Sequence, residues 1–426
     1  MLRFTLTLLI LLFTIIGNAQ SNSLEVFNGE FRHGNFSTDL IIEIDRSNSP
    51  AQIFFSSPEQ NAFRIPAQNA QIDQDSIKFE LQSDFHLYSF QGAIKENSLK
   101  LNLNVDNSDF PFTLNRSSAD KKEIRSRDIR FRNGELLLYG TMYFPEKPNG
   151  KALYLVTSSG NQDRSASRAE AQFFAKQGFI TLHTDKRGTG LSDGNWQAAS
   201  IPELCDDDLR AITYLAETNS LKYSEIGIKG SSQGGAKIPY ILSKMPDLGF
   251  GIVISCPAST LLDSDLNYWK NRNSKNLSEG DLTKAENLQK SVFLFIAGEK
   301  SMEELNKELS NAKDETWREY VWVPELESVE TDRKLAYSPV PYFNKIDQPL
   351  LVVQGSSDEI IPSNSLEAIK DLTESDNDRS SFVFLKEADH AMMFKGNSDF
   401  AYWPSLHPDY RKSMISWLNQ LGISSN

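Results

Sequence analysis

Gly230-Ser231-Ser232-Gln233-Gly234-Gly235 is the stretch that decides how the rest of the chain is interpreted. Before it, residues 224–229 (SEIGIK) alternate as in a strand, and after it residues 236–242 (AKIPYIL) fit a helix. A G-x-S-x-G sequence between a strand and a helix is typical of a nucleophile elbow, a sharp turn that exposes the serine hydroxyl. Glycine suits the crowded positions of such a turn because it has no side chain. Ser232 is therefore the candidate nucleophile, and a purely structural glycine-rich turn is the alternative.

A serine hydroxyl is a poor nucleophile at neutral pH, so it needs a base, and the base needs an acid to orient it. The chain has five histidines. Two of them, His33 and His86, lie in a β-rich N-terminal segment, and His183 falls within a predicted strand, where a packed histidine is expected. Of the remaining two, His407 and His390, we select His390 because it follows the last apolar strand on a predicted loop.

The candidate acid is Asp358, which follows the predicted strand 349–353. Both Asp358 and His390 are thus expected on loops at the carboxyl ends of strands. The chain order becomes Ser232, Asp358, His390, which is the order of nucleophile, acid and base in an α/β-hydrolase.

Residues 129–426 form the predicted catalytic domain, in which strands alternate with helices. Near-continuous apolar strands separated by helices indicate a mainly parallel, doubly covered sheet, and so an α/β fold class. The predicted strands cover 129–131, 136–144, 152–156, 180–183, 224–229, 250–254, 349–353 and 381–385. The predicted helices include 169–177, 201–217, 236–242 and 410–421, and the acidic start of 201–217 (Glu203, Asp206, Asp207, Asp208) suits a helix N-terminus.

A helical insertion is predicted between about residues 260 and 345, where the alternation of strands and helices is broken. An insertion after a sheet strand commonly forms a lid over the active site. Its aromatic residues either line an acyl pocket or form the insertion's own core; they are Trp269, Trp317, Tyr320 and Trp322.

The segment 20–116 predicts a small all-β domain, a meander or open barrel, followed by a charged linker over 117–128. Its strand candidates are 40–44, 51–55, 76–81, 86–90 and 99–105. Two roles remain open for this domain: packing against or shielding the catalytic domain, and binding a polymer or a partner.

Residues 1–19 predict a cleavable signal peptide, with Arg3, an apolar run over 4–16 and small residues at 17–19. The run is shorter than the ~20 residues of a transmembrane helix, which makes a membrane anchor the weaker alternative. We therefore expect a secreted or periplasmic protein with no stable membrane insertion after signal cleavage.

Composition narrows the class of function further. The chain has 426 residues, 39% hydrophobic and 24% charged, as in soluble globular proteins, and its net charge of -13 disfavours nucleic-acid binding. No ligand spacing for a metal and no phosphate-binding glycine loop is present, so we expect no cofactor and no metal. The two cysteines, Cys205 and Cys256, either pair in an oxidising compartment or remain buried thiols.

Two further motifs carry a resemblance to a known family. Residues 160–164 (GNQDR) resemble the Gly-Ser-Gly-Pro-Gln-Asp-Arg oxyanion loop of α/β-hydrolases of the serine esterase and serine aminopeptidase-like branch, and residues 185–192 (DKRGTGLS) are similar to their Asp-Lys-Arg-Gly-x-Gly-x-Ser loop. Such a hydrolase domain preceded by a β-rich segment is similar to some secreted members of the group. The resemblance implies an oxyanion hole made by the backbone N–H groups of Gln233 and Ser159, with Gly160 beside them.

Two positions depart from the family pattern. Thr157-Ser158 stands where relatives have His-Gly, and Ser231 stands where they often have His or Tyr. Backbone donors make the oxyanion hole, so these changes are expected to affect specificity rather than remove the hole. Arg164, Asp185 and Arg187 are expected to support the loops, with substrate contact as the alternative.

Together these features predict a serine hydrolase that cleaves carboxylic esters of small molecules through an acyl-enzyme intermediate. A serine peptidase or aminopeptidase acting on a peptide-like substrate with the same triad is the first alternative. A catalytically inert binding protein is the second.

Overall fold

The computed structural model describes residues 24–47, 49–83, 86–117, 124–373, 379–394 and 396–423. The predicted signal peptide and most of the predicted linker lie outside these ranges. Two compact units can be distinguished. Within the described residues, the first comprises those up to Gly29 together with Ile41–Phe54 and Pro66 onward to residue 117, and the second comprises Glu30–Leu40, Phe55–Ile65 and residues from 124 on.

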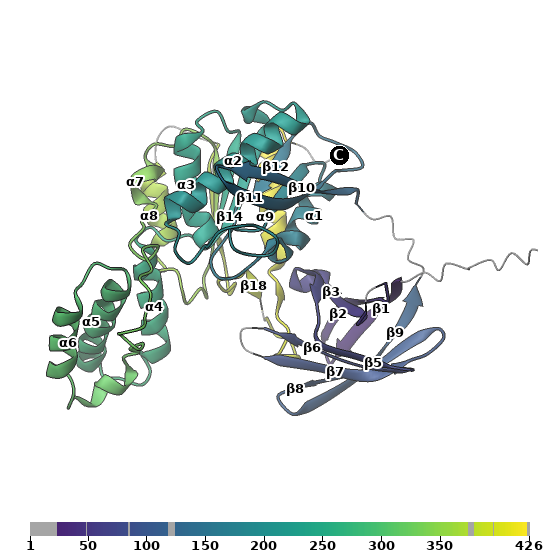
Figure 1. Ribbon diagram of the computed structural model, residues 1–426, viewed down its shortest axis with the longest axis horizontal. Helices are drawn as coiled ribbons and strands as arrows, with labels where there is room; N and C mark the ends of the chain where they lie inside the picture. The colour runs from purple at the N-terminus through teal and green to yellow at the C-terminus, as the bar shows by residue number, and fades with distance from the viewer. Residues whose placement is uncertain are drawn as a thin grey trace, which may run out of the picture. The chain divides into compact units, whose positions relative to one another are not determined.

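The N-terminal strands form one nine-stranded sheet in the order β4-β3-β2-β1-β9-β8-β7-β6-β5 (Figure 1). Alternate residues of β8 are buried, Leu99, Leu101, Leu103 and Val105, as the period of a strand requires. The strands are β1 (Leu24–His33), β2 (Phe36–Asp45), β3 (Gln52–Ser57), β4 (Ala62–Pro66), β5 (Gln68–Asp73), β6 (Ser76–Gln82), β7 (Leu87–Ile94), β8 (Ser98–Val105) and β9 (Ser108–Ser117).

The five strands expected here are present, and β1, β4, β5 and β9 were not predicted. In β5 and β9 few side chains are buried, so the apolar alternation that announces a strand is weak. These two strands are instead held in the sheet by backbone pairing, β5 with β6 and β9 with β8.

The second unit contains an eight-stranded sheet in the order β10-β11-β13-β12-β14-β15-β16-β17. Strand β11 runs antiparallel to both of its neighbours, and the pairs from β13 to β17 are parallel. The predicted α/β-hydrolase sheet is confirmed. The strands are β10 (Ser126–Asn133), β11 (Leu136–Tyr143), β12 (Ala152–Leu155), β13 (Ile180–Thr184), β14 (Ile226–Ser231), β15 (Phe250–Ile254), β16 (Leu350–Gly355) and β17 (Ser381–Leu385).

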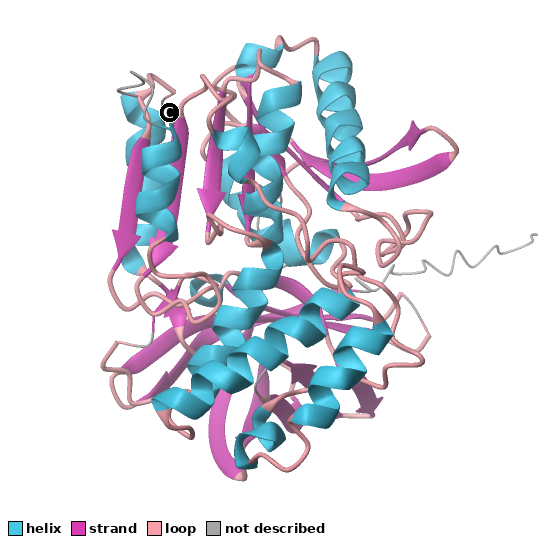
Figure 2. Ribbon diagram, turned by 90° about the vertical axis from the view of Figure 1, so that its left-hand side faces the viewer, coloured by secondary structure: helices cyan, strands magenta, loops and turns pink. Residues whose placement is uncertain are grey.

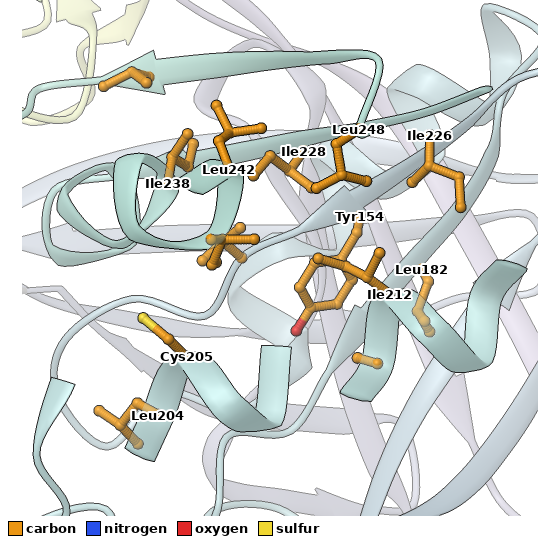
Figure 3. Packing of buried hydrophobic residues seen from close by; sticks show 14 of the residues in the cluster. Tyr154, Leu182, Leu204, Cys205, Ile212, Ile226, Ile228, Ile238, Leu242 and Leu248 are labelled. Atoms are coloured by element: carbon orange, nitrogen blue, oxygen red, sulfur yellow. The ribbon is translucent and has the colours of Figure 1, made fainter. Parts of the chain in front are cut away.

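Helices cover both faces of this sheet (Figure 2). On one face α1 (Arg168–Lys176) and α9 (Pro408–Gln420) bury Phe174 and Trp417. On the other face α2 (Ile201–Asn219), α3 (Gln233–Lys244) and α8 (Ser365–Thr373) pack on the sheet, and Figure 3 shows Ile212 of α2 and Ile238 of α3 in the same apolar cluster as Tyr154. Helix α8 was not among the named predictions.

The insertion is helical as predicted, with α4 (Leu261–Asn273), α5 (Glu279–Ile296), α6 (Met302–Asn311), the 3-10 turn η4 (Thr316–Tyr320) and α7 (Val340–Phe343). Figure 1 shows α4, α5 and α6 gathered at one side of the unit. Trp269 and Trp317 are buried in a cluster with Leu288, Val292 and Leu305, so these two aromatics form the insertion's own core. Trp322, by contrast, is 55% exposed.

Two other predictions from the sequence can be compared with the structure of this unit. Cys205 and Cys256 are both free and buried, so they are not a disulfide. Helix α2 begins with a capping box between Ser200 and Glu203, whereas Asp208 lies further along the helix and is fully buried, so it is not part of a solvated acidic helix start. No helix among the described residues is long and apolar enough to cross a membrane.

Candidate active site

Ser232 stands at a sharp turn between β14 and α3. Its backbone angles are φ 56° and ψ -125°, in a region that residues other than glycine rarely adopt, and its N–H donates to the Ile254 carbonyl at 2.9 Å. A Cβ placed on Gly230 would lie 2.4 Å from the Gly234 carbonyl oxygen, and one on Gly235 would lie 2.8 Å from that of Ile254. The turn therefore requires glycine at these positions, which is the geometry of a nucleophile elbow.

Asp358 and His390 lie in contact at the ends of neighbouring strands. The His390 Nδ1 atom is 3.0 Å from Asp358 Oδ1 and 2.9 Å from Oδ2. Asp358 Oδ1 also accepts the N–H groups of Ile360 and Ile361 at 2.9 and 3.0 Å. The Asp358 side chain is 1% exposed and the His390 side chain 23% exposed. A buried, fully bonded carboxylate thus orients a ring that solvent can reach.

Residues Ile254 and Ser255, at the end of β15, bring the nucleophile and the base to the same edge of the sheet. Ile254 accepts the Ser232 N–H, and the Ser255 hydroxyl donates to the His390 carbonyl at 2.8 Å. Within the described ranges, no hydrogen bond joins the Ser232 hydroxyl to the His390 ring. In free serine hydrolases this contact is often long and tightens when the substrate binds. Ser255 is buried, with φ 48°, and was missed by the sequence interpretation.

The loop that carries His390 is held by short contacts of its own. A Cβ on Gly355 would lie 2.2 Å from the Ala388 carbonyl oxygen, so the close approach of this loop requires glycine. Asp389 accepts the N–H groups of Ala391 and Met393 at 2.9 and 2.8 Å. Burial raises the pKa of Asp389 above its ordinary value. These contacts fix the backbone on both sides of His390.

The predicted oxyanion loop passes over the elbow. The Ser158 hydroxyl donates to the Ser231 carbonyl at 2.9 Å. Gln233 is the first residue of α3, where backbone N–H groups have no acceptor within the helix. Ser159 and Gly160 are exposed, and a Cβ on Gly160, at φ 68°, would meet no atom within 4 Å. The loop is therefore bonded to the residue before Ser232, and the start of α3 directly follows Ser232.

Two buried ion pairs flank the elbow, and the sequence interpretation missed both. Lys229 of β14 bonds to Glu170 of α1, and it also donates to the Ser231 hydroxyl at 2.9 Å. Lys237 of α3 donates to Asp208 at 2.6 Å and to the Thr157 hydroxyl at 2.7 Å. For Lys229 the sequence did hold a signal, namely a lysine near the end of an apolar strand. A buried charge of this kind requires a buried partner of opposite charge.

The Glu170 and Asp208 carboxylates each accept a tyrosine hydroxyl as well. The Tyr410 hydroxyl donates to Glu170 at 2.8 Å, and that of Tyr154 donates to Asp208 at 2.6 Å. Although burial opposes ionisation of Glu170, the Lys229 ammonium and the donated hydrogen bonds lower its pKa. For Asp208 burial prevails, and its pKa is raised.

The other histidines lie elsewhere. His183 is buried in β13 and bonds to the Ser167 hydroxyl at 3.0 Å, and burial together with the Arg168 and Arg164 charges lowers its pKa to about 3. The His407 ring caps α9 by accepting the Asp409 N–H at 3.2 Å. His33 lies in β1, and His86 directly precedes β7, in the nine-stranded sheet.

The predicted supporting network is confirmed by contacts within the protein. Asp185 accepts the Arg164 N–H at 3.0 Å, and Arg187 pairs with Asp207 at 2.6 Å. Among the described residues, no group of three His, Cys, Asp or Glu side chains is placed to hold a metal ion.

Comparisons with known proteins place this site in context. A family model described as X-Pro dipeptidyl-peptidase (S15 family) matches residues 108–392, a range that includes Ser232, Asp358 and His390. An uncharacterized 31.7 kDa protein of the traX-finO intergenic region of Escherichia coli is 23% identical over 206 residues, which is 47% of this chain and 70% of that protein.

An esterase of Pyrococcus furiosus aligns with 15% identity and a TM-score of 0.47, over 71% of this chain and 92% of its own. A proline iminopeptidase of Mycobacterium smegmatis aligns with 14% identity and a TM-score of 0.44, over 69% of this chain and 97% of its own.

Proposed function

Because the chain belongs to the X-Pro dipeptidyl-peptidase (S15) family and is therefore a serine hydrolase, we propose that Ser232, Asp358 and His390 are its catalytic triad. The observation that carries the proposal is the hydrogen-bonded Asp358–His390 pair, held by Ser255 beside the strained turn of Ser232. A serine on such a turn, with an oriented histidine at the same sheet edge, is the arrangement that acyl transfer needs.

In this mechanism His390 Nε2 takes the proton of the Ser232 hydroxyl while Ser232 Oγ bonds to the substrate carbonyl carbon. Asp358 remains ionised and stabilises the imidazolium through Nδ1. The N–H groups of Gln233 and Ser159, with Gly160 beside them, receive the oxyanion. His390 then protonates the leaving group, and a water activated by the same ring breaks the acyl-enzyme bond and restores the serine.

We propose carboxylic esters of small molecules as the first class of substrate. An exopeptidase that binds a free N-terminus needs a carboxylate to receive the substrate's amine. The two carboxylates adjoining the catalytic ring, Asp358 and Asp389, are both occupied by hydrogen bonds within the protein. This arrangement favours an acyl group without a cationic end.

A dipeptidyl-peptidase that releases Xaa-Pro dipeptides is the second candidate, and the family match favours it. The same triad cleaves amides, because His390 protonates the leaving amine as it would an alkoxide. The insertion is rich in acidic side chains that would be available to an amine, including the exposed Glu303 of α6.

A fluorophosphonate probe, which labels active serine hydrolases, tests the function. We expect labelling of the wild-type protein and of Ser231→Ala, the matched neighbouring serine, and none of Ser232→Ala. Hydrolysis of p-nitrophenyl esters, acetylated sugars and Xaa-Pro-arylamides then ranks the two substrate classes. Turnover by Ser232→Ala equal to that of the wild type would remove the assignment, and a folded wild-type protein that takes no label would instead be a binding protein.

We also propose that residues 1–19 are a secretory leader removed after export. The support is the sequence pattern alone, since these residues lie outside the described part of the structure. Expression with the native N-terminus, followed by mass spectrometry of the periplasmic protein, should give a chain that begins near Gln20. An intact N-terminus on cytoplasmic protein would contradict the proposal.

A further inference from the structure

Two loops recognised in the sequence, residues 160–164 and 185–192, dock against each other, and Ser158 and Ser159 precede the first of them. Asp185 accepts the Arg164 N–H at 3.0 Å, and the Thr189 hydroxyl donates to the Gln162 carbonyl at 3.4 Å. Gly190 permits this fold of the second loop, because a Cβ there would lie 2.4 Å from the Asp185 carboxyl carbon. The second loop therefore supports the backbone of the first along several residues.

Lys186 makes the central contact between these loops. Its ammonium donates to the Ser158 carbonyl at 2.8 Å and also to the Gly160 carbonyl, and it lies 4.5 Å from the centre of the Trp196 ring. The residue is 3% exposed. A lysine held in this way carries a positive charge onto the backbone of the predicted oxyanion loop.

The Ser158 carbonyl belongs to the same peptide group as the Ser159 N–H. A charged donor on the carbonyl oxygen draws electron density through the amide and makes its N–H a stronger donor, as in a cooperative hydrogen-bond chain. The second bond, to Gly160, fixes the loop on the other side of Ser159. Lys186 therefore both aims and polarises the N–H assigned to the oxyanion hole.

We propose that Lys186 is a positioning residue for the oxyanion hole, which it serves by holding the 158–159 peptide group toward the acyl carbonyl oxygen at Ser232. This inference rests on the proposed function. Lys186 does not touch the substrate; it acts through the backbone, so its effect belongs to the transition state, in which the oxygen becomes negative.

Lys334, between η4 and α7 of the insertion, is a matched control. It is 4% exposed, and its ammonium lies 5.6 Å from the centre of the same Trp196 ring. It donates to the Gln197 carbonyl at 2.8 Å and pairs with Asp332 at 2.7 Å. These partners lie outside the oxyanion loop, so loss of Lys334 tests the effect of deleting a buried lysine near Trp196 without removing a contact of the loop.

The test compares Lys186→Met with Lys334→Met by steady-state hydrolysis of the best p-nitrophenyl ester. We expect kcat to fall about a hundredfold in Lys186→Met with KM changed by less than about threefold, since a lost oxyanion donor typically costs 10²–10³ in kcat. The affinity for an aryl trifluoromethyl ketone, whose carbonyl carbon bonds Ser232 Oγ as the hydroxyl proton passes to His390, should fall by about the same factor. Lys334→Met should keep kcat within about threefold.

Equal losses in the two variants, or a full kcat in a folded Lys186→Met, would overturn the proposal. Thermal unfolding shows whether Lys186→Met is folded. If it is not, Lys186→Gln, which keeps a neutral donor, takes its place. The kcat of Lys186→Gln should lie below that of Lys334→Met, and a kcat at or above that of Lys334→Met would also overturn the proposal. Ser232→Ala separates the two levels of inference. If that variant is inactive and Lys186→Met is not impaired, only the role of Lys186 fails; if it is active, the proposed function itself fails.

Discussion

The two buried ion pairs beside Ser232 lie on opposite faces of the sheet and support different parts of the site. Lys229 and Glu170, with Tyr410 of α9, form one network and reach the Ser231 hydroxyl, next to the nucleophile. Lys237 and Asp208 lie on the face covered by α2 and α3 and reach Thr157, where the oxyanion loop begins. Each face of the sheet thus supports one part of the proposed site, the elbow on one side and the start of the oxyanion loop on the other.

The comparison also explains where this chain departs from its relatives. Ser231 and Thr157 each present a hydroxyl to one of the two lysines, at 2.9 and 2.7 Å. A buried ammonium needs several acceptors, because an unmet donor in the interior is costly. Ser231 and Thr157, where the sequence departs from the family pattern, are therefore part of the two charged networks.

The largest effect is expected from Lys237→Met. Its side chain and that of Asp208 are both 0% exposed, so the variant leaves a fully buried carboxylate without its cation. Removing one partner of a buried pair typically costs 3–5 kcal/mol, and we expect about 5 kcal/mol here. Denaturant unfolding measures the loss. The double variant with Asp208→Asn should recover part of it, and strict additivity of the two changes would contradict the coupling.

Lys229→Met should cost less, about 3 kcal/mol, at the lower end of the same range. The side chains of Lys229 and Glu170 are 4% and 12% exposed, so the orphaned carboxylate regains some contact with water. The same unfolding experiment gives the comparison. A cost equal to or above that of Lys237→Met would show that exposure does not account for the difference.

Removing one hydroxyl from each network should show that the two networks support different parts of the site. Thr157→Val and Ser231→Ala each deprive a lysine of one acceptor, at about 1–2 kcal/mol of unfolding free energy. Only Thr157→Val is expected to lower kcat several-fold as well, because Thr157 leads into the oxyanion loop. Equal kcat values for the two variants would mean that the networks do not divide the site in this way.

Opposite pH dependences of stability are expected for the two acids. The pKa of Glu170 is below its ordinary value of 4.5, so its contribution is present above that pH and is lost as the pH falls through the folded-state pKa. The pKa of Asp208 is above its ordinary value of 3.8, so folding is favoured as the pH falls toward that value. Relative to the wild type, Glu170→Gln should gain stability and Asp208→Asn should lose it as the pH is lowered from about 7 to about 3.

The smallest expected effect is a change in kcat/KM at alkaline pH. Burial, with the nearby Lys237 and Lys334 charges and against the attraction of Asp208, lowers the pKa of Lys186 to about 8. Lys186 is therefore charged below that pH and neutral above it, and kcat/KM should decline a few-fold on the alkaline side. In Lys186→Arg, whose guanidinium stays protonated, this decline should be absent. An identical decline in both proteins would assign it to another group.

Much of the site could be predicted because its signals are local in the sequence. The glycines around Ser232 and the placement of Asp358 and His390 just after strands follow from short patterns, and the parallel sheet follows from apolar strands alternating with helices. The strain at Ser255 and the need for Gly355 leave no such pattern. They arise where separate strands end side by side.

The buried lysines could not be predicted with their partners. Lys229 and Glu170 are 59 residues apart, and Lys237 and Asp208 are 29 apart, so neither pair is formed within one helix or hairpin. Asp208 was grouped with the acids of a helix start because local sequence shows its charge but not its burial. Which carboxylate meets which ammonium depends on how α1, α2 and α3 pack on the sheet.

Strand β15 ends in the two residues, Ile254 and Ser255, that tie down both nucleophile and base, and the insertion leaves the sheet only after that point, with α4 beginning at Leu261. The contacts that tie Ser232 and His390 to β15 therefore lie outside the insertion, while the insertion contacts α3, where the Tyr337 hydroxyl donates to the Ala236 carbonyl at 3.1 Å. The insertion also contacts the loop of the proposed acid, because Asn267 and Asn271 of α4 donate to the Glu359 carbonyl beside Asp358, at 3.2 and 2.8 Å. A change in the insertion is therefore expected to act on the loop of Asp358 and on α3, and not on the contacts that tie Ser232 and His390 to β15.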